Sequence, residues 1–136
     1  MITFDNEQGG DAMTTHEIAK RYVALCQAGK NEVCLDELFA KDAVSVEAAD
    51  FPGMERTTKG LDAIRAKNVS WAENHTVHRA EVTGPFPNDN RFAVRFAYDT
   101  TDKQSGKRMN MDEIGLFTIE GGKITREEFF YPTDAN

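Results

Sequence analysis

Residues 91–119 read RFAVRFAYDTTDKQSGKRMNMDEIGLFTI and contain two runs in which apolar side chains recur at every second position. Alternation with a period of two is typical of strands that have one buried face. The polar segment at 102–106 separates the runs and predicts the loop of an antiparallel hairpin. The two strands therefore present apolar rows on one face of a sheet, and this face is expected to carry a covering layer.

One carboxylate interrupts the apolar row of the second strand. That row reads Met109, Met111, Glu113, Gly115, Phe117 and Ile119. A buried carboxylate is unfavourable by several kcal/mol unless it is paired, hydrogen-bonded or protonated. Glu113 is therefore interpreted in two ways, as an acid in a ligand pocket or as the partner of a buried arginine. Arg95 and Arg126, on neighbouring strands, are the candidate partners.

Three helices are predicted ahead of the long strands. The first begins with the capping-box spacing of Thr14 and Glu17 and ends near Gly29. The second spans about 32–40 and the third about 61–72, where apolar residues recur at helical intervals. The second helix is expected to bury Val33, Leu35, Leu38 and Phe39.

The order of helices and strands predicts the fold class. Strands are expected at 44–47, 76–83, 91–101, 108–119 and 123–131, and residues 50–60 are expected to form a loop. Helices followed by long antiparallel strands favour an α+β domain, with three N-terminal helices packed on one face of a strongly curved antiparallel sheet. Such a sheet leaves a cavity between itself and the helices. Residues 14–132 are predicted to form one domain, after a flexible leader at 1–13 and before a tail at 133–136.

Composition excludes several classes of partner. The net charge of −7 and the dispersed basic residues argue against nucleic acid or an anionic membrane surface. No apolar run approaches the ~20 residues of a membrane span and no signal peptide is recognisable, so a cytoplasmic protein is expected. Cys26 and Cys34 are interpreted as small buried thiols. His16, His75 and His78 lack metal-ligand spacing, and neither a metal nor a cofactor is predicted.

Four short strings occur in an order that resembles the nuclear transport factor 2-like superfamily, specifically its SnoaL-like and ketosteroid-isomerase-like branch. They are LFAKDAV at 38–44, KGLDAI at 59–64, GKI at 122–124 and REEFFY at 126–131. The resemblance implies a cone-shaped α+β barrel with a ligand pocket at its open end, and a homodimer formed through the outer face of the sheet. The superfamily holds isomerases, cyclases, dehydratases and proteins without a known reaction, so the fold does not determine the reaction.

The resemblance also implies site residues. In the isomerase-like branch the general base is a carboxylate at the end of the first strand, and the matching position is Glu47. An acid that donates to the substrate oxygen lies on the strand that contains Glu113, and a tyrosine of the first helix matches Tyr22. Alternation alone places Glu47 in the more polar row of its strand, with Ser45, and therefore on a solvated face. The two interpretations of Glu47 remain open.

Further side chains are candidates for the same pocket. Glu127 and Glu128 are adjacent, so only one faces the interior, and Glu128 is predicted because it shares a row with Phe130. His78 shares a row with Ala80 and is interpreted as an interior residue, either structural or in the pocket. Two interpretations are open for the aromatic and methionine residues of these elements: ordinary core packing, or an apolar wall for a flat ligand. These residues are Tyr22, Trp71, Tyr98, Met111 and Phe130.

The sequence predicts a small cofactor-independent enzyme that binds an apolar carbonyl compound. The expected chemistry is proton transfer of the isomerase, cyclase or dehydratase type, with Glu47 as the base and Glu113 as the acid. Glu128 and Tyr22 are expected to support them. The alternative is a non-catalytic ligand-binding or dimerisation module of the same fold, in which the interior acids pair with Arg95 or Arg126.

Overall fold

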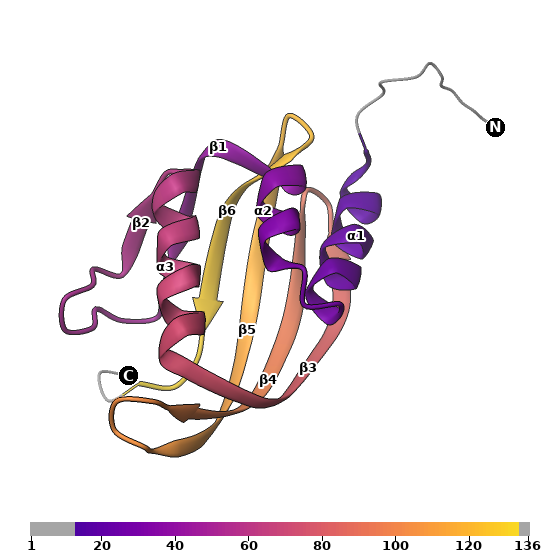
Figure 1. Cartoon of the computed structure of the whole chain (residues 1–136). Helices are drawn as coiled ribbons and strands as arrows, with labels where there is room; N and C mark the ends of the chain where they lie inside the picture. Colours follow the sequence, from indigo (N-terminus) through magenta and orange to yellow (C-terminus); the bar gives the residue numbers. More distant parts are fainter. Residues whose placement is uncertain (1–12, 134–136) are drawn as a thin grey trace.

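The computed structural model describes residues 13–133, and Figure 1 shows helices lying across one face of a single curved sheet. In chain order the elements are α1 (Thr15–Gln27), α2 (Asn31–Leu38), β1 (Phe39–Val46), β2 (Thr57–Lys59), α3 (Leu61–Asn74), β3 (His75–Asn88), β4 (Arg91–Asp102), β5 (Arg108–Glu120) and β6 (Lys123–Phe130). Almost all of the predicted leader, and the last three residues of the predicted tail, lie outside the described residues.

The strands form one open sheet in the order β2-β1-β6-β5-β4-β3. Neighbouring strands are antiparallel except β1 and β6, which are parallel. The predicted α+β class is confirmed. The segment predicted as a loop contains the short strand β2, because the β-branched Thr57 and Thr58 pair with Val46 and Ser45 of β1.

The first helix follows the sequence prediction. The Thr14 hydroxyl accepts a hydrogen bond from the Glu17 amide (3.1 Å), and the Glu17 carboxylate accepts one from the Thr14 amide (2.8 Å). This capping box satisfies amides that have no partner within the helix. Ile18, Tyr22 and Leu25 recur at helical spacing and are buried against the sheet. No helix among residues 13–133 has the length and apolar character needed to cross a membrane.

The second helix is shorter than predicted and exposes one of its apolar residues. It ends at Leu38, and the chain enters β1 at Phe39. Val33 is 43% exposed, whereas Cys34 and Leu35 are buried. A helix this short has one face against the core, and Val33 lies on the far side of the helix from the buried residues. The expectation that Val33 is buried was wrong.

Aromatic rings fill the space between the helices and the sheet. The Phe92 and Phe117 ring centroids lie 4.8 Å apart, and the Tyr22 ring lies 4.4 Å from that of Phe117. Phe117 and Ile119 are buried, and the opposite row of β5 is more exposed. The predicted orientation of β5 is confirmed, and Glu113 lies in the row that faces the helices.

Gly115 occupies a point of close approach in the same row. A Cβ atom at this position would lie 2.8 Å from Phe117 Cε1 and 3.1 Å from Phe96 Cε2. Because these rings are packed, Gly115→Ala is expected to lower the free energy of unfolding by about 1–3 kcal/mol. Urea denaturation measures the change. The exposed Asn110→Ala on the same strand is the control, and an equal loss in both variants would contradict the packing explanation.

Candidate functional site

Four ionisable side chains meet on the helix-facing side of the sheet. They are Glu47 just beyond β1, Lys67 on α3, Glu113 on β5 and Glu127 on β6. The parallel pairing of β1 with β6 places Ser45 opposite Glu127, and β5 is the next strand along. Strands that are distant in sequence therefore bring three carboxyl groups and one ammonium into a single cluster.

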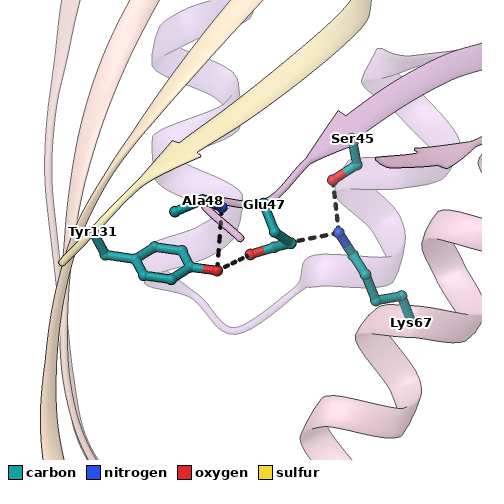
Figure 2. Close-up of polar contacts among 5 residues, drawn as sticks. All are labelled: Ser45, Glu47, Ala48, Lys67 and Tyr131. Carbon is teal, nitrogen blue, oxygen red and sulfur yellow. Dashed lines mark hydrogen bonds and ion pairs between the residues drawn. The ribbon is translucent and has the colours of Figure 1, made fainter. Parts of the chain in front are cut away.

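Both carboxylate oxygens of Glu47 are engaged. Lys67 Nζ donates to Glu47 Oε2 (2.8 Å) and the Tyr131 hydroxyl donates to Glu47 Oε1 (2.8 Å), as Figure 2 shows. Lys67 Nζ also donates to Ser45 Oγ (2.7 Å), and the Tyr131 hydroxyl accepts from the Ala48 amide (3.4 Å). The side chains of Lys67 and Glu47 are only 13% and 16% exposed, so the ion pair is largely shielded from water. Its geometry fixes the direction of the carboxylate.

The position of Glu47 overturns the solvated face that alternation predicted. Ser45 is fully buried, and the row that it shares with Glu47 faces the interior. Strand β1 has neighbours on both sides and lies under α3, so Ser45 is shielded from water and Glu47 is largely shielded. The Lys67 ammonium, in place of water, donates hydrogen bonds to Ser45 and Glu47. A catalytic role for Glu47 remains a prediction.

Glu113 is partly buried and differs from Glu47 in having no hydrogen bond or ion pair with any residue in 13–133. Burial raises the pKa of Glu113 to about 7 from its usual value of 4.5, and the negative charges of Glu47 and Glu127 add to the rise. The Lys67 ammonium opposes the shift. Glu113 therefore holds a proton over much of the range near neutrality.

The alternative interpretation, in which Glu113 pairs with Arg95 or Arg126, was wrong. Arg95 forms a two-pronged ion pair with Asp112, with nitrogen–oxygen distances of 2.9 and 2.8 Å. Arg126 lies 3.4 Å from Glu128. Arg95 and Arg126 belong to the outward rows of their strands, so neither guanidinium reaches the interior.

Glu127, and not Glu128, is the interior carboxyl of β6. Glu127 is 4% exposed, whereas the Glu128 side chain is 31% exposed and pairs with Arg126. Phe129 packs against the core and Phe130 faces outward, so the row chosen from the sequence was the wrong one. Two aromatic residues in succession gave no local signal of which one faces the core. The placement of Glu128 and Phe130 in the pocket is corrected accordingly.

Burial also affects Glu127. It raises the pKa of Glu127 to about 7, while the Ser45 hydroxyl and the Lys67 ammonium partly offset the rise. Glu113 and Glu127 therefore titrate in the same range and influence one another. The cluster contains one ion-paired carboxylate and two carboxyl groups that are protonated below neutral pH.

His78 does not lie in the interior. It is exposed, and its Nε2 lies 2.8 Å from Thr101 Oγ1. Strand β3 lies at the edge of the sheet, and residues 76–81 are exposed on both of its faces, so neither row of this part of the strand reaches the interior. The expectation that His78 faces the interior was wrong.

The remaining aromatic candidates divide into two groups. Tyr22 is buried among phenylalanine rings and belongs to the core. Trp71 stacks on His75 (4.4 Å between centroids) and lies 6.0 Å from Tyr98. Tyr98 is opposite Met111 on β5, two positions before Glu113. Trp71, Tyr98 and Met111 therefore form one partly exposed apolar group beside the carboxyl cluster.

The sequence interpretation missed Lys67 and Tyr131. Lys67 follows Ile64 by three positions and precedes Trp71 by four, so helical spacing places it on the interior face of α3. The helical spacing in the sequence was therefore sufficient to predict the interior position of Lys67. Tyr131 meets Glu47 across 84 positions of sequence, and no local pattern indicates such a contact.

Two hollows open on the surface. The larger, about 560 Å³, is lined by residues between Asp50 and Thr57, and the smaller, about 340 Å³, is lined by residues of α1 and β3. Neither is lined by Glu113 or Glu127. The larger adjoins the cluster, because the Phe51 ring stacks on the Tyr131 ring at 6.4 Å. Within residues 13–133 no group of three histidine, cysteine or acidic side chains is placed to hold a metal ion.

An open curved sheet under three helices is a fold that this chain shares with solved nuclear transport factor 2-like proteins. The chain belongs to the SnoaL-like domain family, whose model matches residues 13–131. The resemblance identified from the four strings is confirmed.

Solved structures agree with this assignment. A Mesorhizobium loti protein, described as a proposed SnoaL-like polyketide cyclase and as a carbohydrate phosphatase, is 43% identical with a TM-score of 0.83, over 88% of this chain and 100% of that one. A nuclear transport factor 2-like protein of Burkholderia xenovorans is 18% identical with a TM-score of 0.70, over 90% and 92% of the two chains. A proposed polyketide cyclase of Pseudomonas putida is 20% identical with a TM-score of 0.63, over 90% and 94%. The last two similarities support the fold alone. Among curated proteins none matched the sequence.

Proposed function

We propose that this protein binds a small apolar carbonyl compound and catalyses proton transfer on it, in isomerase, cyclase or dehydratase chemistry. The contrast between Glu47 and Glu113 carries the proposal. Glu47 accepts hydrogen bonds at both oxygens and is paired with an ammonium, whereas Glu113 has no partner among residues 13–133 and has a pKa raised to about 7. Two carboxyl groups whose surroundings favour different protonation states supply a base and an acid near neutral pH.

The roles follow from these protonation states. Glu113 in its protonated form donates a hydrogen bond to the ligand carbonyl oxygen and stabilises the negative charge that grows there. Glu47 removes a proton from the carbon next to the carbonyl and returns it to another atom of the ligand. Lys67 and Tyr131 fix the direction of the Glu47 carboxylate. Trp71 and its apolar neighbours Tyr98 and Met111 would form the wall for the body of the ligand.

One relative supports a carbonyl compound as the ligand. The Mesorhizobium loti protein, which is 43% identical, is described as a proposed polyketide cyclase and also as a carbohydrate phosphatase. Polyketides carry ketone groups along an apolar chain, which suits a protonated carboxyl beside an apolar wall. Aromatic polyketide-like ketones are therefore the first ligands to test.

A thermal-shift screen tests the proposal. Wild type, Glu113→Gln and the control Asp112→Asn are heated with polyketide-like aromatics, steroids, lactones and epoxides. Asp112 is adjacent in sequence but pairs with Arg95 on the outer face. A ligand at about 100 times its dissociation constant stabilises the native state by about 2.7 kcal/mol. We expect a ligand that stabilises wild type and Asp112→Asn but acts weakly on Glu113→Gln. Equal stabilisation of all three, or none with any compound, would contradict the proposal.

A homodimer through the outer face of the sheet belongs to the same proposal. Ile114 and Phe130 are directly opposite each other on β5 and β6, and both are exposed apolar side chains. An exposed apolar pair on a flat sheet face suits a second copy of the chain.

The dimer has a direct prediction. A charge in the apolar contact disfavours association, so Phe130→Asp is expected to reduce the mass in light scattering from twice the chain mass of 15.2 kDa to that of a single chain. Val33→Asp places the same charge at an exposed site on α2 and is expected to leave the dimer intact. A monomeric wild type, or dissociation by both variants, would refute this interface.

A further inference from the structure

Lys67 is the one basic side chain that acts on the interior carboxyl groups among residues 13–133. Its ammonium lies 2.8 Å from Glu47 Oε2 and 2.7 Å from Ser45 Oγ. The groups that face this cluster come from six elements: Ser45 and Glu47 of the β1 segment, Glu113 of β5, Glu127 of β6 with Tyr131 beyond it, Tyr98 of β4, Tyr22 and Cys26 of α1, and Cys34 of α2. One positive charge is therefore shared among three carboxyl groups.

The position of the ammonium is well defined. Lys67 lies on the face of α3 that includes the fully buried Ile64, so its stem runs into the interior. Its Nζ lies 5.9 Å from the centre of the Phe129 ring, a favourable distance for a cation over an aromatic face. The hydrogen bonds to Glu47 and Ser45 use two of its three donors.

We propose that Lys67 is a positioning residue that assigns the acid and base roles: its ammonium holds the negative charge of the cluster on Glu47, and it leaves Glu113 and Glu127 without an ion-pair partner among residues 13–133. The assignment rests on the proposed acid–base function and deepens it. It differs from a purely structural ion pair because it predicts which carboxyl groups hold protons.

Charge balance supports placing the negative charge on Glu47 and not on the other two carboxyl groups. A buried carboxylate needs a counter-charge, and the single ammonium supplies one, at the shortest distance, to Glu47. A second negative charge in the same place is disfavoured by repulsion from the first. Burial is the largest cause of the raised pKa of Glu113 and of Glu127, and the Glu47 charge adds to the rise of both. Without the ammonium, Glu47 would be a buried charge with only the Tyr131 hydroxyl for support, and it would take up a proton.

Carboxyl titration by NMR tests the assignment without a substrate. Protein labelled with ¹³C at the glutamate side chains is titrated between about pH 5 and 9, a range that spans the raised pKa values of about 7. In wild type at about pH 6 we expect the Glu47 signal in the ionised position and the Glu113 signal in the protonated position. In Lys67→Met the Glu47 signal should move to the protonated position, and in the charge-conserving Lys67→Arg it should stay. A Glu47 signal that stays ionised in Lys67→Met would overturn the proposal.

Two further variants complete the experiment. Lys123→Met removes a surface lysine that donates to the Glu37 carbonyl, and it is expected to leave all three signals unchanged. If Lys67→Met fails to fold, Glu47→Gln replaces it, because this change removes the negative charge and keeps the side-chain shape. The Glu113 midpoint should then fall by about 1 pH unit or more. An unchanged midpoint would overturn the proposal. A protein that shows these shifts and transforms no ligand would refute the enzyme function and leave the role of Lys67 intact.

Discussion

Glu113→Gln is expected to lower the rate of proton transfer on a bound carbonyl ligand by roughly 100-fold, while the protein remains folded. Glutamine keeps the shape of the side chain, but its amide N–H is a weaker hydrogen-bond donor than a carboxylic acid O–H to the oxygen on which negative charge grows. Because Glu113 has no hydrogen bond or ion pair with residues 13–133, its replacement leaves no partner group unsatisfied. The measurement is deuterium uptake from heavy water at the carbon next to the carbonyl, followed by mass spectrometry.

Asp112→Asn is the matched control for this result. Asp112 is the preceding residue on the same strand, but its side chain faces outward and pairs with Arg95. Removing this exposed pair is expected to change the exchange rate by less than about twofold and the stability by less than about 1 kcal/mol. Exchange at the wild-type rate in Glu113→Gln would show that this carboxyl takes no part in the chemistry.

The protein is expected to become less stable as the pH rises from about 5 to 8, with a combined loss of about 5 kcal/mol. Glu113 and Glu127 have pKa values of about 7 in the folded protein and near 4.5 in the unfolded chain. Between these values the folded state binds more protons than the unfolded state, so the free energy of unfolding falls as the pH rises. The stabilising contribution is complete below about pH 4.5 and is lost once the pH has passed about 7.

Urea denaturation at about pH 5.5 and 8.5 measures this trend, on either side of the folded pKa values of about 7. The exposed ion pairs affect the free energy of unfolding only at lower pH. Hydrogen bonds from arginines lower the pKa of Glu37, Asp99 and Asp112, so these carboxylates take up protons only under more acid conditions. Glu113→Gln and Glu127→Gln should each flatten the dependence, and each should unfold at a higher urea concentration than wild type at the alkaline end. Stability that is constant or rises over this range would contradict the raised pKa values.

Part of the site could be predicted from local pattern. The alternation in β5 placed Glu113 in the row of Phe117, and that row does face the helices. The signal was clear because the row is long and its opposite row carries most of the polar residues. The capping box of Thr14 and Glu17 was equally local and was also found.

The rest of the site depends on contacts between distant parts of the chain. The parallel pairing of β1 with β6 encloses Ser45, so a polar row became an interior one. Lys67 and Tyr131 reach Glu47 across 20 and 84 positions of sequence. In β6, the local sequence does not show whether Glu127 or Glu128 faces the interior. The pairing of β6 with β5 determines which row faces inward. Polarity alone misleads where one buried polar group satisfies another.

The most direct measurement is the ¹³C carboxyl titration of the wild-type protein, because it reports how many interior carboxyl groups hold a proton near neutrality. We predict that Glu113 and Glu127 are protonated at about pH 6 and titrate near 7, while the exposed Glu37, whose pKa is lowered by the hydrogen bond from Arg21, is already ionised at about pH 6. Ionised signals from Glu113 and Glu127 at about pH 6, with midpoints near the usual value of 4.5, would show that the interior holds no acid for proton transfer.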